Sequence, residues 1–157
     1  MALRVRRPIY TAECNRRTYG YARVRLRRFK HVQVFRGDSR DLLRRLAKGN
    51  ADRHATGFFY LDAHPSDKLP LKAKLEQVYT HWLRPIVMID DFAAPGDPSY
   101  GYDDYGSAGV LTLEYIRPLL QRFRIACFFP RRSALLETGV RRGYIVLARA
   151  PGHIEAL

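Results

Sequence analysis

Two apolar runs that each end in aspartate decide the fold. They read Phe58-Phe59-Tyr60-Leu61-Asp62 and Ile86-Val87-Met88-Ile89-Asp90-Asp91. Both runs are short, rich in aromatic or β-branched residues, and apolar at every position before the acid. This pattern is typical of parallel strands that are covered on both faces of a sheet. The acids then mark the carboxyl ends of two strands.

Similar runs and helical patterns alternate along the rest of the chain. Strands are expected over 9–12, 32–35, 125–129 and 144–147 as well. Helices are expected after an N-cap at Asn15, after a cap at Ser39, over Leu71–Trp82 and around Val110–Leu120, where Pro118 should kink or break the helix. The alternation predicts an α/β fold with an open, doubly wound, mostly parallel sheet.

Composition limits the classes of protein that remain. The 157 residues suit one domain over 1–157, and 46% hydrophobic residues are enough for a core. Lys and Arg number 28 against 15 Asp and Glu. The excess fits either an anionic partner or a solvated surface, and scattered arginine pairs do not make a basic tail. No signal peptide, membrane span or spaced Cys/His zinc cluster is evident, so a cytoplasmic setting is expected.

Carboxylates follow each of the first four predicted strands. In open α/β sheets, ligands bind beyond the carboxyl ends of the strands. Glu13 is placed to accept hydrogen bonds from a ribose diol. Asp38 and Ser39 lie in a turn that could read an adenine edge, although Ser39 serves equally well as a helix cap. Any one of these acids alone is more simply an exposed residue at a strand end.

Three aspartates form the candidate metal set. Asp62, Asp90 and Asp91 are hard oxygen donors on two strands, and neighbouring strands lie about 4.8 Å apart. They could therefore meet around one Mg²⁺ ion. The alternative is that Asp90 or Asp91 caps the turn that follows.

The ordered set of motifs resembles a known family. The set is Ile9 to Asn15, Gly37-Asp38-Ser39, Tyr60 to His64, Ile89-Asp90-Asp91-Phe92 and Pro95-Gly96-Asp97-Pro98. It is similar to class I S-adenosylmethionine-dependent methyltransferases, closest to the family 24 type and to cephalosporin-hydroxylase-like and catechol O-methyltransferase-like relatives. The resemblance covers nearly the whole chain.

The resemblance implies roles for the strand-end residues. It implies that S-adenosylmethionine is held by Glu13 at the ribose, by Asp38 and Ser39 at the adenine, and by Asp62. In metal-dependent relatives, the positions of Asp62, Asp90 and Asp91 bind Mg²⁺, which activates the attacking oxygen. His64 or Lys68 could assist deprotonation. The implied reaction is O-methylation of a small molecule or a sugar.

The resemblance also implies a sheet order and a departure from it. The family order is 3-2-1-4-5-7-6, with a final antiparallel strand. This chain starts near the second family strand, and it has no Gly-x-Gly loop. A Rossmann-like sheet without its central first strand is therefore expected, in a partial methyltransferase domain that is a truncated or mis-started chain. Inner strand edges would then be unpaired.

Other functions and partners remain open at this point. The chain could be a basic nucleic-acid-binding module without catalysis, or an interaction domain that has lost activity. We expect a small-molecule acceptor rather than nucleic acid, and no membrane partner. The loop Pro95–Gly106 is expected to close over the acceptor site. Its Tyr100, Tyr102 and Tyr105 could stack on a substrate ring or pack the loop down.

Overall fold

The computed structural model describes residues 7–49, 53–62 and 69–150. The chain divides into two compact units, Met1–Ala51 and Asp52–Leu157, each of which is described by itself. Six strands and four α-helices lie in the described part of the chain, and every strand predicted from the sequence is present there. None of the helices in those residues is long and apolar enough to cross a membrane.

The first unit holds a parallel pair of strands and two helices. β1 (Ile9–Glu13) and β2 (Val32–Arg36) pair in register from Ile9 with Val32 to Glu13 with Arg36. α1 (Arg16–Leu26) begins where predicted, because Asn15 accepts from the N–H groups of Arg17 and Thr18. The strand pair and its crossover helix form one βαβ unit.

α2 (Ser39–Lys48) completes the first unit, and its cap differs from the prediction. The N-cap is Asp38, whose carboxylate accepts the N–H of Arg40 at 2.7 Å. Ser39 is the first residue of the helix, so the prediction that it caps the helix was wrong. Asp38 has the extended backbone that a cap requires, with φ −67° and ψ 137°. Gly49 ends the helix as predicted.

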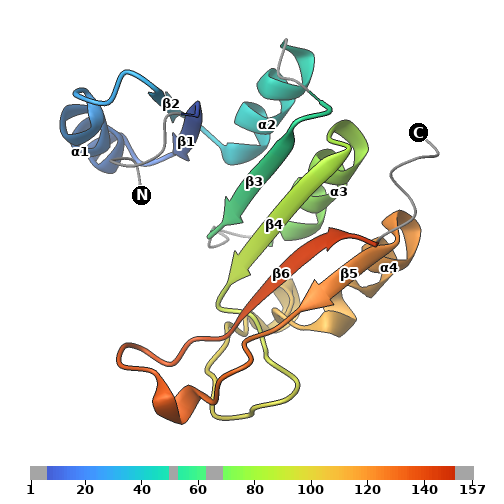
Figure 1. The fold of residues 1–157 in the computed structure, drawn as a ribbon. Coiled ribbons are helices and arrows are strands. Elements are labelled where there is room, and N and C mark those ends of the chain that lie inside the picture. The colour runs from blue at the N-terminus through green and yellow to red at the C-terminus, as the bar shows by residue number, and fades with distance from the viewer. Residues whose placement is uncertain (1–6, 50–52, 63–68, 151–157) are drawn as a thin grey trace. The chain divides into compact units, whose positions relative to one another are not determined.

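The second unit is built on a four-stranded sheet in the order β3-β4-β6-β5. Its strands are β3 (Thr56–Leu61), β4 (Arg84–Asp90), β5 (Ile125–Phe128) and β6 (Tyr144–Arg149). β3 and β4 are parallel, and β6 runs antiparallel between β4 and β5 (Figure 1). The sheet is therefore mixed, with the predicted antiparallel last strand.

In both sheets the strand order agrees with the order implied by the resemblance. β2-β1 corresponds to family strands 3-2, and β3-β4-β6-β5 corresponds to 4-5-7-6. Within the described residues, the two sheets share no hydrogen-bonded strand pair. The described residues thus have the predicted α/β, Rossmann-like arrangement with a mixed sheet.

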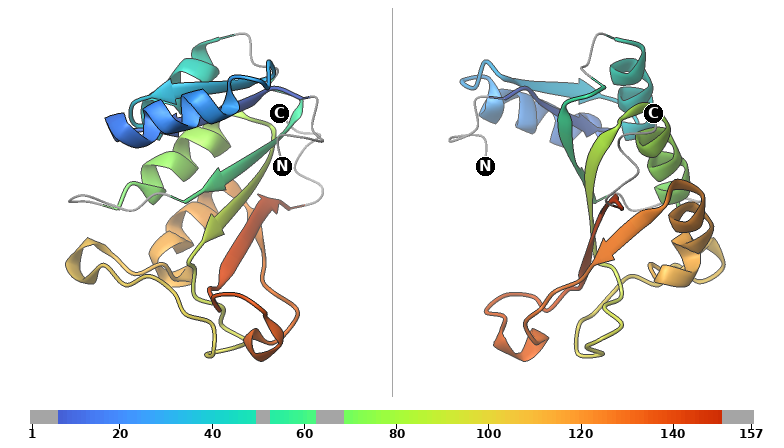
Figure 2. Two further views of the ribbon diagram at one scale, coloured as in Figure 1. Left: turned by 90° about the vertical axis from the view of Figure 1, so that its left-hand side faces the viewer. Right: turned by 45° about the vertical axis from the view of Figure 1, so that its right-hand side comes forward.

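α3 (Leu71–His81) and α4 (Leu113–Phe123) cover one face of the four-stranded sheet (Figure 2). α4 begins later than predicted and continues through Pro118, so the helix is not broken at that residue. The core between helices and sheet is almost fully buried. It contains Leu75, Val78, Val87, Ile89, Ile116, Ile145 and Leu147.

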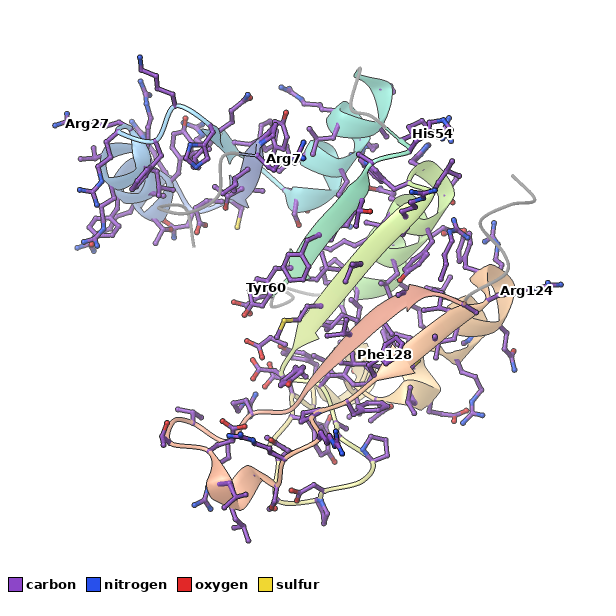
Figure 3. The ribbon with its side chains drawn as sticks, in the orientation of Figure 1. Arg7, Arg27, His54, Tyr60, Arg124 and Phe128 are labelled. Atoms are coloured by element: carbon purple, nitrogen blue, oxygen red, sulfur yellow. The ribbon has the colours of Figure 1, made fainter. Side chains whose placement is uncertain are left out.

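The opposite face of the same sheet carries exposed apolar side chains. The register places Tyr60, Met88, Val146 and Phe128 in one row across the four strands. Tyr60 is 50% exposed and Phe128 is 56% exposed, and both are labelled in Figure 3. The prediction that these strands are covered on both faces is therefore wrong for the described residues, in which α3 and α4 cover a single face.

Candidate functional site

A pocket lies at the carboxyl ends of the parallel strands β3 and β4. Four aspartates line it, together with one lysine and one tyrosine from other elements. They are Asp62, Asp90, Asp91, Asp103, Lys74 and Tyr105. Apolar side chains of β3, β4, α3 and the adjoining loops form its base. The cavity encloses about 20 Å³, which is room for one water-sized group such as a hydroxyl or a methyl.

Three of the predicted site residues meet at this pocket. Asp62 directly follows β3, Asp90 ends β4, and Asp91 leaves β4 in a left-handed conformation with φ 55°. Because β3 and β4 are parallel and adjacent, their carboxyl ends lie at the same edge of the sheet. His64 and Lys68, the predicted catalytic residues, lie outside the described residues.

Asp90 and Asp91 are each engaged by a neighbouring side chain. The hydroxyl of Tyr60 donates to Asp90 Oδ2 at 2.6 Å. That hydrogen bond, with burial as the next cause, raises the pKa of Tyr60 well above its usual range. Arg142 pairs with Asp91 through Nε, and with Asp103 through Nη2. The hydrogen bond that Arg142 donates to Asp91 is the main cause that raises the pKa of Arg142.

The pocket does not have the arrangement of a magnesium site. Within residues 7–49, 53–62 and 69–150, no three His, Cys, Asp or Glu side chains are placed to hold a metal ion. The physical reason is the engagement of two members of the predicted set. The guanidinium of Arg142 takes the place of a cation at Asp91, and one oxygen of Asp90 is turned to a phenol hydroxyl, so the set does not converge in the near-octahedral geometry that Mg²⁺ requires.

Lys74 and Arg142 are functional-site residues that sequence reasoning missed. Lys74 is only 3% exposed although it is charged, and it lines the pocket from α3. The signal in the sequence was its position between Leu71 and Leu75 on the apolar side of the helix. A buried charge is costly unless polar or oppositely charged groups lie near it, and Lys74 lines the same pocket as four aspartates. Arg142 gave no such signal, because it precedes β6 in a loop with many polar residues.

The long loop after β4 closes one side of the pocket. Tyr105 lines the cavity, and its hydroxyl donates to Asp103. Burial, followed by that hydrogen bond, raises the pKa of Tyr105. Tyr100 is 3% exposed, and its hydroxyl donates to Glu137 Oε1 at 3.2 Å. Tyr100 thus packs the loop down, while Tyr102 remains 46% exposed.

The other predicted cofactor residues lie in the first unit. Glu13 is the last residue of β1, and its Oε1 accepts the N–H of Asn15 at 2.8 Å. Asp38 caps α2 and also forms a bidentate ion pair with Arg40, whose Nε and Nη2 both donate to the carboxylate. Ser39 follows it in the first turn of α2. All three lie at the carboxyl ends of the parallel pair β1 and β2.

Comparisons with known proteins support the fold. No protein-family model matches the chain, and no curated protein matches it. A candidate methyltransferase of Streptococcus mutans, solved in complex with SAH, aligns over 91% of this chain and 76% of its own with 9% identity and a TM-score of 0.49. An rRNA methylase from Streptococcus thermophilus aligns over 90% of this chain and 74% of its own with 16% identity and a TM-score of 0.51. At such identity the second likeness shows a fold similar to that of a methyltransferase, and no more.

Proposed function

We propose that the protein is an S-adenosylmethionine-dependent methyltransferase that acts on a hydroxyl oxygen. One observation carries the proposal: an acidic pocket lies at the carboxyl ends of β3 and β4, in a sheet whose order, β3-β4-β6-β5, agrees with the 4-5-7-6 part of the order that the resemblance implies. Such strand ends are where open α/β sheets bind ligands. The fold alone does not establish an activity, so the proposal depends on the charge and position of the pocket residues.

The charge of the pocket suits a cationic cofactor. Four carboxylates line it, and Lys74 and Arg142 offset two of them, which leaves a net charge of −2 among the described residues. S-adenosylmethionine carries a positive sulfonium. At a partly desolvated site, such a cation is attracted to carboxylates more strongly than it would be in water. The pocket therefore favours the sulfonium form over its neutral thioether product.

Methyl transfer requires alignment and a proton acceptor. An oxygen lone pair of the acceptor attacks the methyl carbon, the carbon–sulfur bond breaks, and its electron pair goes to sulfur. Because the sulfonium loses its charge in this step, the acidic pocket stabilises the bound cofactor more than the transition state. The rate gain comes from holding the two reactants in line. We assign to Asp62, the exposed carboxylate of the pocket, the uptake of the hydroxyl proton.

The proposal also gives roles to the first unit. The carboxylate of Glu13 accepts from the ribose hydroxyls, and the Asp38–Ser39 turn contacts the adenine. Each of these residues lies directly at or after the carboxyl end of a parallel strand. The acceptor proposed is a small molecule or a sugar that presents a hydroxyl to a water-sized cavity.

Calorimetric titration of the intact chain tests the proposal. We expect saturable binding of S-adenosylmethionine at one site, with weaker binding of S-adenosylhomocysteine. Glu13→Ala should lower the affinity for both ligands by about tenfold, because it removes charge-assisted hydrogen bonds. Asp90→Asn should lower the preference for the sulfonium.

The matched control is Glu114→Gln, which removes an exposed carboxylate on α4. It should leave both affinities within about twofold, as expected for a surface charge outside the pocket. Absence of binding by the folded chain, or equal losses in Glu114→Gln and Glu13→Ala, would overturn the proposal.

A further inference from the structure

The positive charge of the protein is concentrated in one of its two units. Met1–Ala51 has 15 Lys and Arg but only 3 Asp and Glu, a net charge of +12. Asp52–Leu157 has 13 Lys and Arg and 12 Asp and Glu, a net charge of +1. The arginine pairs that look scattered along the sequence therefore belong mostly to one small βαβα unit. A field of that strength attracts polyanions.

Within the first unit, more than half of the excess lies on α1 and the turn that follows it. Residues 16–30 contain seven Lys and Arg and no Asp or Glu. Two of the three acids of the unit pair elsewhere, Asp38 with Arg40 and Asp41 with Arg44 on α2. Among the described residues, no ion pair joins α1 to a carboxylate. The arginines of α1 thus remain available to an outside anion.

The outer face of α1 combines these cations with exposed apolar groups. Tyr21 is 63% exposed and Val24 is 62% exposed. Arg25 lies 5.6 Å from the centre of the Tyr21 ring, and its Nη1 donates to the Tyr21 hydroxyl at 3.0 Å. A surface groove is lined by Val24, Arg25, Arg27 and Arg28. Arg27 points outward from this end of the helix (Figure 3).

This pattern fits a single strand of nucleic acid. We propose that the outer face of α1, with Arg27, Arg28 and Lys30 beyond its end, binds single-stranded RNA. The arginines would contact phosphates, and the ring of Tyr21, held by Arg25, would stack against an unpaired base. Charged grooves with exposed aromatic rings are the usual means of binding single strands.

A lipid surface fits the same charge less well. An interfacial helix needs a broad apolar face that is free to enter the membrane. The inward side of α1, with Tyr19, Ala22 and Leu26, is less exposed and packs toward β2. On its outward side Tyr21 and Val24 are the large apolar groups, and they lie among arginines, so the broad apolar face that lipid requires is not formed there.

Fluorescence anisotropy with a labelled 16-nucleotide oligouridine and the intact chain tests the inference. With about four phosphates contacted, affinity should fall about fiftyfold between 50 and 200 mM salt. The double variant R27Q/R28Q should weaken binding about tenfold and flatten the salt dependence, because two phosphate contacts are lost. The matched control is R131Q/R132Q, which removes two exposed arginines from the second unit and should stay within about twofold.

The stacking role has its own pair of variants. Tyr21→Ala should weaken binding at least about fivefold with an unchanged salt slope, and Tyr21→Phe should restore it, because stacking requires only the ring. Equal losses of affinity for the oligouridine in R27Q/R28Q and R131Q/R132Q would overturn the inference. So would equal or tighter binding of a duplex RNA, or complete competition by vesicles that contain one quarter anionic lipid.

The inference goes beyond the proposed methyl transfer and fails separately from it. R27Q/R28Q should leave the affinity for S-adenosylmethionine unchanged, since neither arginine belongs to the proposed cofactor site. A chain that binds RNA but no cofactor would retain this inference and lose the proposed function.

Discussion

The guanidinium of Arg142 pairs with the carboxylate of Asp91, and this contact ties the loop before β6 to the end of β4. Asp91 holds a left-handed backbone conformation, with φ 55°, that glycine, asparagine and aspartate adopt more readily than other residues. The same guanidinium also pairs with Asp103 in the long loop. One side chain thus fixes three segments that surround the pocket.

Replacement of Arg142 should therefore destabilise the second unit. Arg142→Met leaves two carboxylates, each with 18% side-chain exposure, without their cation. The free energy of unfolding should fall by about 2 kcal/mol, less than for a fully buried pair because Arg142 is one-third exposed. Urea unfolding measures the change. Arg141→Met, next to it but exposed, should cost less than about 0.5 kcal/mol. Equal costs for the two variants would contradict the role of Arg142.

Gly143 is a second position at which the loops around the pocket leave no room for a larger residue. A Cβ atom there would lie 2.2 Å from the carbonyl oxygen of Phe92. That backbone cannot easily retreat, because the N–H of Phe92 donates to the carbonyl of Gly143 at 2.9 Å. Gly143→Ala should cost about 2 kcal/mol or more in thermal or urea unfolding. Gly139→Ala is the control, since nothing lies within 4 Å of its Cβ position. If Gly143→Ala left the free energy of unfolding unchanged, the two loops would pack together more loosely than this distance requires.

Acid pH should loosen the loop that follows β4, through Asp97. Its carboxylate accepts hydrogen bonds from Ser99 and from the N–H of Ala134 at 2.8 Å, and these lower the pKa of Asp97 to about 2. Because the pKa is lower in the folded state, the stabilisation is complete above about pH 4 and is lost as pH falls toward 2. Asp97→Asn should therefore unfold with a weaker pH dependence in that interval. NMR titration of the carboxyl carbon would contradict this account if the pKa were near 4.

The sequence predicted the strands well because they carry their own signal. Runs such as Ile86 to Ile89 are apolar at every position and end in aspartate, so both their location and the polarity of their ends are encoded locally. The same local signal places Asp62, Asp90 and Asp91 at one edge of the sheet, as predicted. The strand order came from the resemblance, since local patterns do not encode which strands are neighbours.

Features that depend on contacts between distant residues were not predictable in the same way. Asp91 was expected to serve a metal, but its actual partner, Arg142, is 51 residues away in the chain. Tyr60 looked like a residue of a doubly covered strand, yet it lies on an exposed face and donates to Asp90. The choice of Asp38 over Ser39 as the cap depends on backbone angles, which the residue types alone do not fix.

The central claim is that the strand-end carboxylates bind S-adenosylmethionine, and NMR of the isotopically labelled chain tests it most directly. On titration with S-adenosylhomocysteine, the backbone amide signals of Cys14, Asn15, Ser39, Asp62 and Asp91 should shift in a saturable manner. The amide signals of Gln121 and Arg122, which are exposed in the last turn of α4, should remain unchanged. Shifts confined to other residues, or none at millimolar ligand, would contradict the assignment.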